Sequence, residues 1–168
     1  MRNLAEVAAA VPARLYSSLD QLDMQNQGYG FVLNRAARYI TRIYNRRLAD
    51  VSLTLSQYGT LAAIAETGPV ALQDLAEQLV IERSALLRMV QKLLSARFLL
   101  SMPDPSSKRR LLYQITNDGY RCLAAAAACV CEAEAEIEQR FERVNIMSVR
   151  DGLLPIADAC GSEDSSTR

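Results

Sequence analysis

Apolar residues in this chain recur mostly at intervals of three and four positions, which is the spacing of amphipathic helices. The pattern predicts a long helix from about Tyr29 to Ala49. It predicts a second helix that begins near Ser56, a suitable N-cap, and ends at Gly68-Pro69. A third, short helix follows over about Leu72 to Leu79. The chain is therefore expected to be mainly helical.

A tight helix pair and a hairpin are predicted next. The turn Val80-Ile81-Glu82 is all that separates the third helix from a fourth, which covers about Arg83 to Ala96. Two short helices joined this closely indicate a helix-turn-helix. The apolar runs Phe98–Met102 and Leu111–Ile115 then flank a loop rich in proline, serine and basic residues, which predicts a β-hairpin with Lys108-Arg109-Arg110 at its tip. A β-hairpin that directly follows a helix-turn-helix is the wing of a winged helix-turn-helix.

Both ends of the chain are predicted to be helical. Thr116 is expected to cap a long helix that reaches about Arg143 and carries an apolar residue every seven positions. A last helix is predicted from about Met147 to Cys160, and leucines at helical spacing between Leu15 and Leu22 indicate a short amphipathic arm. None of these helices could bury its apolar stripe alone, which predicts a homodimer held by the terminal helices.

The predicted fold class is mainly α with a small β-hairpin wing, an α+β winged helix-turn-helix. Residues 1–50 are expected to hold the arm and the first long helix, and residues 51–116 the winged helix-turn-helix. Residues 117–160 hold the C-terminal helices, which form the dimerisation domain together with the N-terminal part. Residues 161–168 are expected to be a disordered tail.

The distribution of charge is more informative than its sum. The 168 residues carry 19 basic and 19 acidic side chains, and a net charge of zero by itself argues against a nucleic-acid-binding protein. Between Arg83 and Arg110, however, seven basic residues stand against one acid, while between Glu132 and Glu142 five glutamates stand against one arginine. Such a basic segment can present a cationic surface to phosphate; an ordinary solvated surface is the alternative.

Composition also bears on location and on chemistry. No run approaches the roughly 18 apolar residues of a membrane span, and the N-terminal apolar run, interrupted by Glu6, is a poor signal peptide. We therefore expect a cytoplasmic protein with no membrane partner and four reduced cysteines. The absence of histidine and of a glycine-rich phosphate loop argues against an enzyme. No cofactor or metal is expected.

If this segment binds double-stranded DNA, the first turns of the fourth helix supply the base contacts, because a helix fits the major groove. Arg83 or Arg88 could pair with guanine, and Ser84 could bind a base or a phosphate. Ala85 could lie against a thymine methyl group. The candidate DNA-binding residues are Gln73, Arg83, Ser84, Ala85, Arg88, Met89, Lys108, Arg109 and Arg110. The residues expected to face inward are Leu86, Leu87, Val90, Leu93 and Leu94.

Two further contacts are expected outside the fourth helix. Gln73, near the start of the third helix, could reach a phosphate. The cationic run Lys108-Arg109-Arg110 is placed to enter the adjacent minor groove or to clamp its phosphates. An ordinary soluble hairpin tip is the alternative interpretation of that run.

An ordered set of short segments resembles one family of bacterial regulators. The segments are Leu53–Tyr58, Leu75–Leu79, Ser84–Val90, Lys108–Arg110 and Ile115–Gly119. Together they resemble the MarR/SlyA family over about residues 29–158. The resemblance implies a homodimer with two winged lobes that read a pseudo-palindrome. It also implies an effector pocket between the dimerisation helices and each lobe, often for phenols or aromatic acids.

The sequence departs from the family pattern at two positions. The family's wing usually carries Asp-x-Arg, and here Ser107 replaces the aspartate while Arg109 matches the arginine. The turn before the recognition helix often holds a glycine-like residue, and here it holds Val80.

Arg35, Arg38, Arg42 and Arg46 recur at helical spacing and form a basic stripe on the first long helix. One interpretation is that Arg35 and Arg38 bind an anionic effector, with Tyr39 and Tyr58 as aromatic walls. The resemblance places Tyr58 at a position that lines the pocket in relatives. In the other interpretation, the arginines pair with the acidic run Glu132–Glu138 or contact DNA phosphates.

The function predicted from the sequence is a DNA-binding transcription regulator, a repressor released from a pseudo-palindromic operator by a small aromatic acid or phenol. One alternative is a redox sensor, since Cys122 and Cys129 share a helical face. The resemblance argues against it, because the peroxide-sensing branch keeps its reactive cysteine near the start of the first conserved helix, where none occurs here. The other alternative is a winged-helix adaptor that binds proteins and not DNA.

Overall fold

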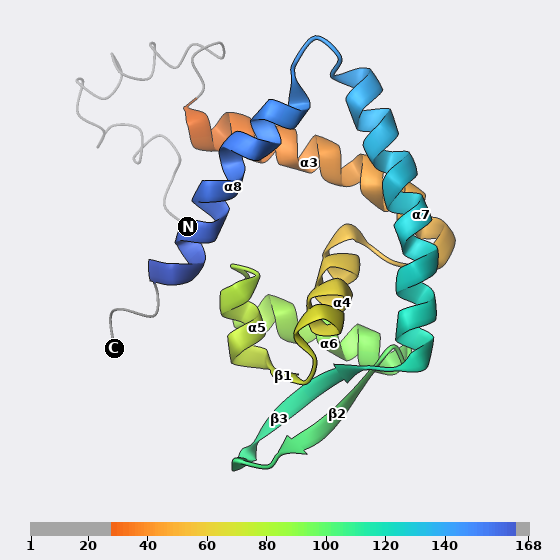
Figure 1. Cartoon of the computed structure of the whole chain (residues 1–168), viewed down its shortest axis with the longest axis vertical. Helices are drawn as coiled ribbons and strands as arrows, with labels where there is room; N and C mark the ends of the chain where they lie inside the picture. The colour runs from red at the N-terminus through yellow and green to blue at the C-terminus, as the bar shows by residue number, and fades with distance from the viewer. Residues whose placement is uncertain (1–27, 164–168) are drawn as a thin grey trace, which may run out of the picture. The chain divides into compact units, whose positions relative to one another are not determined.

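The structure is a computed structural model that describes residues 28–163, including all their side chains except those of Lys108 and residues 156–163. It divides into two compact units, Met1–Tyr39 and Ile40–Arg168. The predicted arm at Leu15–Leu22 lies outside the described residues. The elements, labelled in Figure 1, are α3 (Tyr29–Leu48), a 3₁₀ turn η1 (Ala49–Val51), α4 (Leu55–Thr67), β1 (Val70–Ala71), α5 (Leu72–Gln78), α6 (Arg83–Ser95), β2 (Leu99–Asp104), β3 (Ser107–Ile115), α7 (Asn117–Arg140) and α8 (Ile146–Glu163).

In the first unit, the described residues belong to the N-terminal part of α3. Their large apolar side chains are exposed: Tyr29 is 91% accessible and Phe31 is 62% accessible, and Val32 and Leu33 are also exposed. An apolar helix surface of this kind suits contact with another protein surface.

A winged helix forms the centre of the second unit. Helices α4, α5 and α6 enclose a core in which Leu61, Leu75 and Leu86 are fully buried. The predicted hairpin is confirmed as β2 and β3, which project from this core (Figure 1). The structure adds a strand that the sequence did not indicate, because β1 pairs antiparallel with β3 through Val70–Tyr113 and Ala71–Leu112. The sheet order is β1-β3-β2.

Two predicted helix starts can be checked against their caps. The start of α4 is capped by Thr54 and not by Ser56: Thr54 Oγ1 accepts from Gln57 N at 3.3 Å, and Gln57 Oε1 accepts from Thr54 N at 2.9 Å. This reciprocal pair is a capping box, so Ser56 falls inside the first turn. The predicted cap of α7 is confirmed, since Thr116 Oγ1 accepts from Gly119 N at 3.0 Å.

The wing tip is shorter than predicted. Strands β2 and β3 extend to Asp104 and Ser107, so residues 108–110 lie within β3 and not at the tip. The turn closes early because Asp104 Oδ1 accepts hydrogen bonds from Ser106 N at 2.8 Å and from Ser106 Oγ at 2.6 Å. Aspartate commonly stabilises a turn in this way, by bonding to the backbone two residues on.

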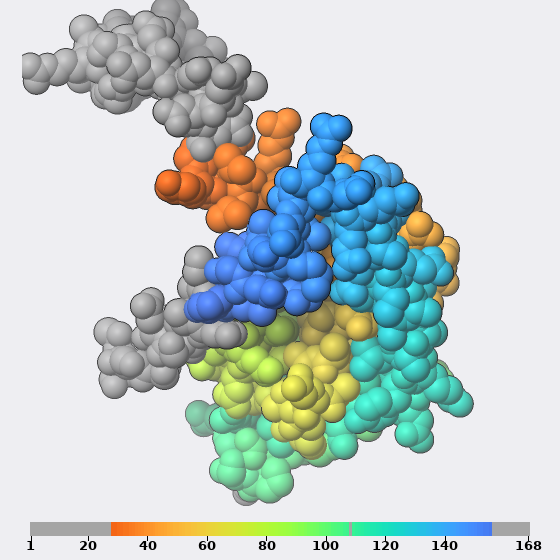
Figure 2. Space-filling model, turned by 45° about the horizontal axis from the view of Figure 1, so that its top comes forward, coloured from red at the N-terminus to blue at the C-terminus, as the bar shows by residue number. Residues whose placement is uncertain are grey.

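A smaller apolar cluster joins the C-terminal half of α3 to α7 and α8. Ile43, Ala133 and Ile137 are buried there, and Ile146 packs against them from the start of α8. Helices α7 and α8 diverge from the turn that joins them (Figure 1), and the wing lies at the opposite end of this unit from that turn (Figure 2). Helix α8 extends to Glu163, so residues 161–163 are helical and not part of a disordered tail as predicted. The remaining tail residues lie outside the described range.

Candidate nucleic-acid interface

Helix α6 presents a polar edge at its N-terminal end. Arg83, Ser84 and Arg88 are exposed there, as the sequence analysis requires of base-contacting residues. Ala85 is half-buried, and Met89 packs against the core while keeping part of its surface accessible.

The predicted inward face of α6 is largely correct. Leu86, Val90 and Leu93 are buried, and Leu94 is half-buried against the core. The prediction for Leu87 was wrong, since this side chain is 38% accessible. Leu87 follows Leu86 by about 100° around the helix, which turns it from the core towards the edge beside the wing.

A groove of about 420 Å³ runs between α5, the start of α6 and β3. Its polar lining includes Gln73 and Asp74 from α5, Arg83 from α6, and Arg109 and Arg110 from β3. Leu87 contributes part of the apolar lining. The fold thus brings four candidate residues to one surface from three separate segments. The side chain of Lys108 is not described.

The cations of this surface differ in their surroundings. Among the described residues, Arg83, Arg88 and Arg109 have no hydrogen-bond or ion-pair partner. Arg110, in contrast, forms an ion pair with Asp74, and its Nε lies 3.6 Å from Asp104 Oδ2. Hydrogen bonds from Ser106 hold the pKa of Asp104 below its usual range, and Arg110 adds to this effect.

The turn between α5 and α6 contains an unusual backbone conformation. Val80 has φ = 51°, in the left-handed region, and its side chain is 58% exposed. A β-branched residue is rarely found there, because its Cβ crowds the backbone, whereas glycine fits freely. The departure from the glycine-like pattern noted in the sequence therefore falls at a position whose geometry favours glycine.

The base of the wing is locked to the start of α7. Thr116 Oγ1 donates to Arg97 O at 2.8 Å, and Thr116 N donates to Phe98 O at 2.9 Å. A Cβ on Gly119 would lie 2.6 Å from Ile115 Cγ1 and would also collide with Phe98 O. Glycine is therefore required at this junction, which fixes α7 against the end of α6 and the start of β2.

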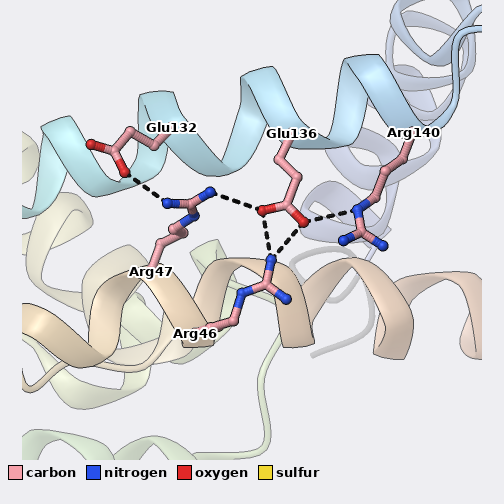
Figure 3. Close-up of polar contacts among 5 residues, drawn as sticks. All are labelled: Arg46, Arg47, Glu132, Glu136 and Arg140. Carbon is pink, nitrogen blue, oxygen red and sulfur yellow. Dashed lines mark hydrogen bonds and ion pairs between the residues drawn. The ribbon is translucent and has the colours of Figure 1, made fainter.

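An ion-pair network connects α3 to α7 (Figure 3). Arg46 Nη2 lies 2.5 Å from Glu136 Oε1, and Arg47 bridges Glu136 and Glu132, each at 3.1 Å. Arg140 Nε is 2.8 Å from Glu136. Hydrogen bonding from Arg46, followed by Arg47, lowers the pKa of Glu136 from 4.5 to about 2.

This network bears on the basic stripe at one of its four arginines. Arg46 pairs with the acidic run, as the second interpretation of the basic stripe proposed. Arg47 was missed because it lies outside the three-and-four spacing of that stripe. The sequence offered two hints of this pairing: Arg47 directly follows Arg46, and the acidic run contains glutamates four residues apart, which lie on one face of a helix.

The predicted effector residues lie in different parts of the chain. Arg35, Arg38 and Tyr39 are exposed and belong to the unit Met1–Tyr39. Tyr58 is half-buried and packs against the winged-helix core. Their role in effector binding stays a prediction.

A cavity of about 270 Å³ lies between α3, α7 and α8 within the second unit. Ile40, Ile137 and Leu153 give it apolar walls, while Tyr44, Glu134, Glu138 and Arg150 provide polar groups. The Tyr44 hydroxyl donates to Glu134, and burial followed by this carboxylate raises the pKa of Tyr44. The sequence pattern does not indicate this set of residues, because its members come from three helices that are distant along the chain.

The described cysteines, Cys122, Cys129 and Cys131, are all free thiols. Burial raises the pKa of Cys122, which keeps it protonated and reduces its reactivity. Neither Cys129 nor Cys131 forms a disulfide bond with another described cysteine. Among the side chains that the structure describes, no group of three could hold a metal ion, and no described helix is long and apolar enough to cross a membrane.

Comparison with known proteins supports the same fold. Residues 53–111 match the model of the MarR family. The chain is 26% identical over 96 residues to the HTH-type transcriptional repressor NicR of Pseudomonas putida, covering 57% of this chain and 61% of that protein. It is 31% identical over 78 residues to the multiple antibiotic resistance protein MarR of Salmonella typhimurium, covering 46% and 54%. The chain therefore spans less than two thirds of these relatives.

Solved structures cover more of the chain. A mutant MarR from E. coli, crystallised with operator DNA, has a TM-score of 0.68 at 20% identity, covering 76% of this chain and 91% of that one. A MarR-family regulator from Rhodococcus sp. has a TM-score of 0.65 at 25% identity, with the same coverage. The fold class predicted from the sequence, a mainly helical winged helix with a small antiparallel sheet, is confirmed.

Proposed function

We propose that this chain, in which residues 53–111 match the MarR family model, is a regulator of that family, which binds DNA sequence-specifically to control transcription and is not an enzyme. We further propose that it represses, as the relative named a transcriptional repressor does. We propose a cytoplasmic location as well, because a regulator of transcription must reach the DNA that it controls.

The observation that carries the proposal is the polar edge of α6 together with the groove beside it. Arg83, Arg88 and Arg109 are exposed and lack ion-pair partners among the described residues. A cation that no carboxylate neutralises is available to a phosphate or to a guanine edge. In the proposed complex, the start of α6 enters the major groove and β3 brings Arg109 to the adjacent backbone.

We propose that two copies assemble through the terminal helices. The support is the exposed apolar surface of each: Tyr29 and Phe31 on α3, and Met147 and Leu154 on α8. A dimer presents two recognition helices and so reads a pseudo-palindromic site. Leu154→Glu, which places a charge on this apolar surface, is expected to yield monomers in analytical ultracentrifugation.

DNA binding is tested by measuring affinity for random duplex DNA over a range of salt concentrations. Arg88→Ala and Arg109→Ala are each expected to weaken binding, and Arg109→Ala also to lower the slope of log K against log salt by about 0.9, because it removes a phosphate contact. Arg143→Ala is the matched control, since this exposed arginine lies beyond the winged helix. Unchanged affinity in both test variants, with the dimer intact, would contradict the assigned DNA surface.

We propose that a small effector releases the DNA, and that a phenol is a better candidate than an aromatic acid for the cavity between α3, α7 and α8. Glu134 and Glu138 would repel a carboxylate there, and Arg150, the cation of the same lining, already pairs with Asp151. Either glutamate can accept a hydrogen bond from a phenolic hydroxyl. A thermal-shift comparison of a phenol with the benzoate of the same ring tests this preference. Stabilisation by the benzoate alone would instead favour the arginines Arg35 and Arg38.

The two rival functions have less support. A redox sensor needs a reactive thiolate, and burial raises the pKa of Cys122. A protein-binding adaptor has no need for unpaired arginines along the recognition helix and the wing. Absence of DNA binding even at low salt would favour the adaptor.

A further inference from the structure

The outer half of the wing lies beyond β1, the short strand that joins the inner half of the wing to the winged-helix core. β1 pairs with β3 only at Tyr113 and Leu112, whereas β2 pairs with β3 as far as Pro103–Leu111 and, after a break in the register that leaves residues 108–110 of β3 without a β2 partner, again at Asp104–Ser107. Residues 107–111 of β3 therefore have no β1 partner. A two-stranded overhang needs additional contacts to keep a fixed angle to the helices.

Arg110 makes such a contact. Its guanidinium pairs with Asp74, in the first turn of α5, and its Nε lies 3.6 Å from Asp104 Oδ2 on β2. One side chain thus connects the helix-turn-helix to both strands of the wing at the level where β1 has ended. Arg109, its neighbour along β3, lines the same groove without a carboxylate partner among the described residues.

The charges at this point are poorly suited to binding a phosphate. One guanidinium between two carboxylates leaves a net charge of −1 for the three groups. Asp74 also places a negative charge in a groove that would face DNA. Side chains of Arg110 and Asp74 are 44% and 55% exposed, and an ion pair this accessible contributes little to folding stability.

We propose that Arg110 is a positioning residue and not a DNA contact: with Asp74 and Asp104 it sets the angle of the wing, so that Arg109 reaches the DNA backbone. This inference rests on the proposed function. It reassigns one member of the basic run, and it explains how the wing is supported although Ser107 replaces the aspartate of the family pattern.

The test is a double-mutant cycle measured by binding of a fixed random-sequence duplex. Asp74→Asn and Arg110→Gln are each expected to weaken binding at least about twofold, and the double variant to be no weaker than Arg110→Gln alone. The salt slope stays unchanged in all three, whereas Arg109→Gln lowers it by about 0.9. Glu66→Gln, which removes an exposed acid from α4, controls for the change in net charge.

The result for Asp74→Asn is the most discriminating. Removing a negative charge near DNA should tighten binding by simple electrostatics, so weaker binding points to lost positioning. Tighter binding by Asp74→Asn, with a reduced salt slope in Arg110→Gln, would show that Arg110 contacts phosphate and would overturn the proposal. Unchanged affinity in both single variants would overturn it as well.

A measurement without DNA separates this proposal from the proposed function. Amide ¹⁵N relaxation should show greater motion of residues 104–111 in Asp74→Asn and Arg110→Gln than in the wild type or Glu66→Gln. One possible result is that this motion appears, while no variant alters DNA binding and the wild type shows no salt-dependent binding. In that case Arg110 does hold the wing in position, and the proposed DNA-binding function is wrong. If the motion is unchanged, the positioning role of Arg110 is refuted.

Discussion

Substitution of Gly119 by alanine tests the junction between the wing and α7. The new Cβ would lie 2.6 Å from Ile115 Cγ1 and would overlap with Phe98 O. That oxygen also accepts from Thr116 N at 2.9 Å and from Thr116 Oγ1 at 3.2 Å. Because both obstacles belong to the base of the wing, relief requires the start of α7 to move away from it.

The magnitude follows from three contributions. Overpacking of this kind costs about 1–3 kcal/mol, and weakening the hydrogen bond to Phe98 O costs about 1 kcal/mol. The higher helix propensity of alanine returns about 1 kcal/mol. The free energy of unfolding should therefore fall by about 2 kcal/mol, which lowers the Tm of a protein of this size by roughly 4–8 °C.

Thermal and urea unfolding measure this change. Gly59→Ala is a matched control, because Gly59 lies inside α4 and a Cβ there meets nothing within 4 Å. It should raise the free energy of unfolding by up to about 1 kcal/mol, the propensity contribution alone. If Gly119→Ala were as stable as Gly59→Ala, the close approach of α7 to Phe98 would be wrong.

Three further predictions concern other parts of the fold. Glu136 has a lowered pKa in the folded protein, so its ion pairs stabilise the fold above about pH 4.5 and this contribution is lost as the pH falls towards about 2. Acid titration of Glu136→Gln should accordingly show a smaller loss of stability over that range than the wild type, and identical curves would refute the network. Thr54→Ala removes the capping box of α4 and should cost about 1 kcal/mol in urea unfolding, whereas Ser56→Ala should be close to neutral; the reverse order would restore the cap predicted from the sequence. At neutral pH, a thiol reagent should modify exposed Cys131 before Cys122, whose pKa is raised by burial, and mass spectrometry of the labelled peptides gives the order. Faster labelling of Cys122 would contradict its burial and reopen the redox alternative.

Much of the winged helix could be predicted because its signals are local. Gly68 ends α4 with φ = 83°, a conformation that glycine adopts freely, and Thr116 caps α7 through an atom three residues from its partner. The two helices of the helix-turn-helix and the strands of the hairpin follow from short-range periodicity. The capping box at Thr54 was equally local, since Thr54 and Gln57 have the required spacing, but Ser56 competed for the same role.

The features that were not predicted depend on residues distant along the chain. β1 has only two residues, and it can be recognised as a strand only because these residues pair with Tyr113 and Leu112. The pair Arg110–Asp74 joins positions 36 residues apart, and Arg46–Glu136 joins positions 90 apart. From its residue type alone, each member of these pairs would be expected to be a charged side chain exposed to solvent. A single sequence carries no periodicity that would indicate which opposite charge is its partner.

The two-residue tip of the wing has a consequence for how such proteins can diversify. Pro105 and Ser106 are exposed, and the residues on either side already complete the strand pairing. Chain inserted between them would lengthen the hairpin without disturbing the helices, since exposed loop tips are where insertions are best tolerated. In the proposed complex with DNA, the reach of the protein along the duplex would therefore change with the length of this one turn, while α6 stays as it is.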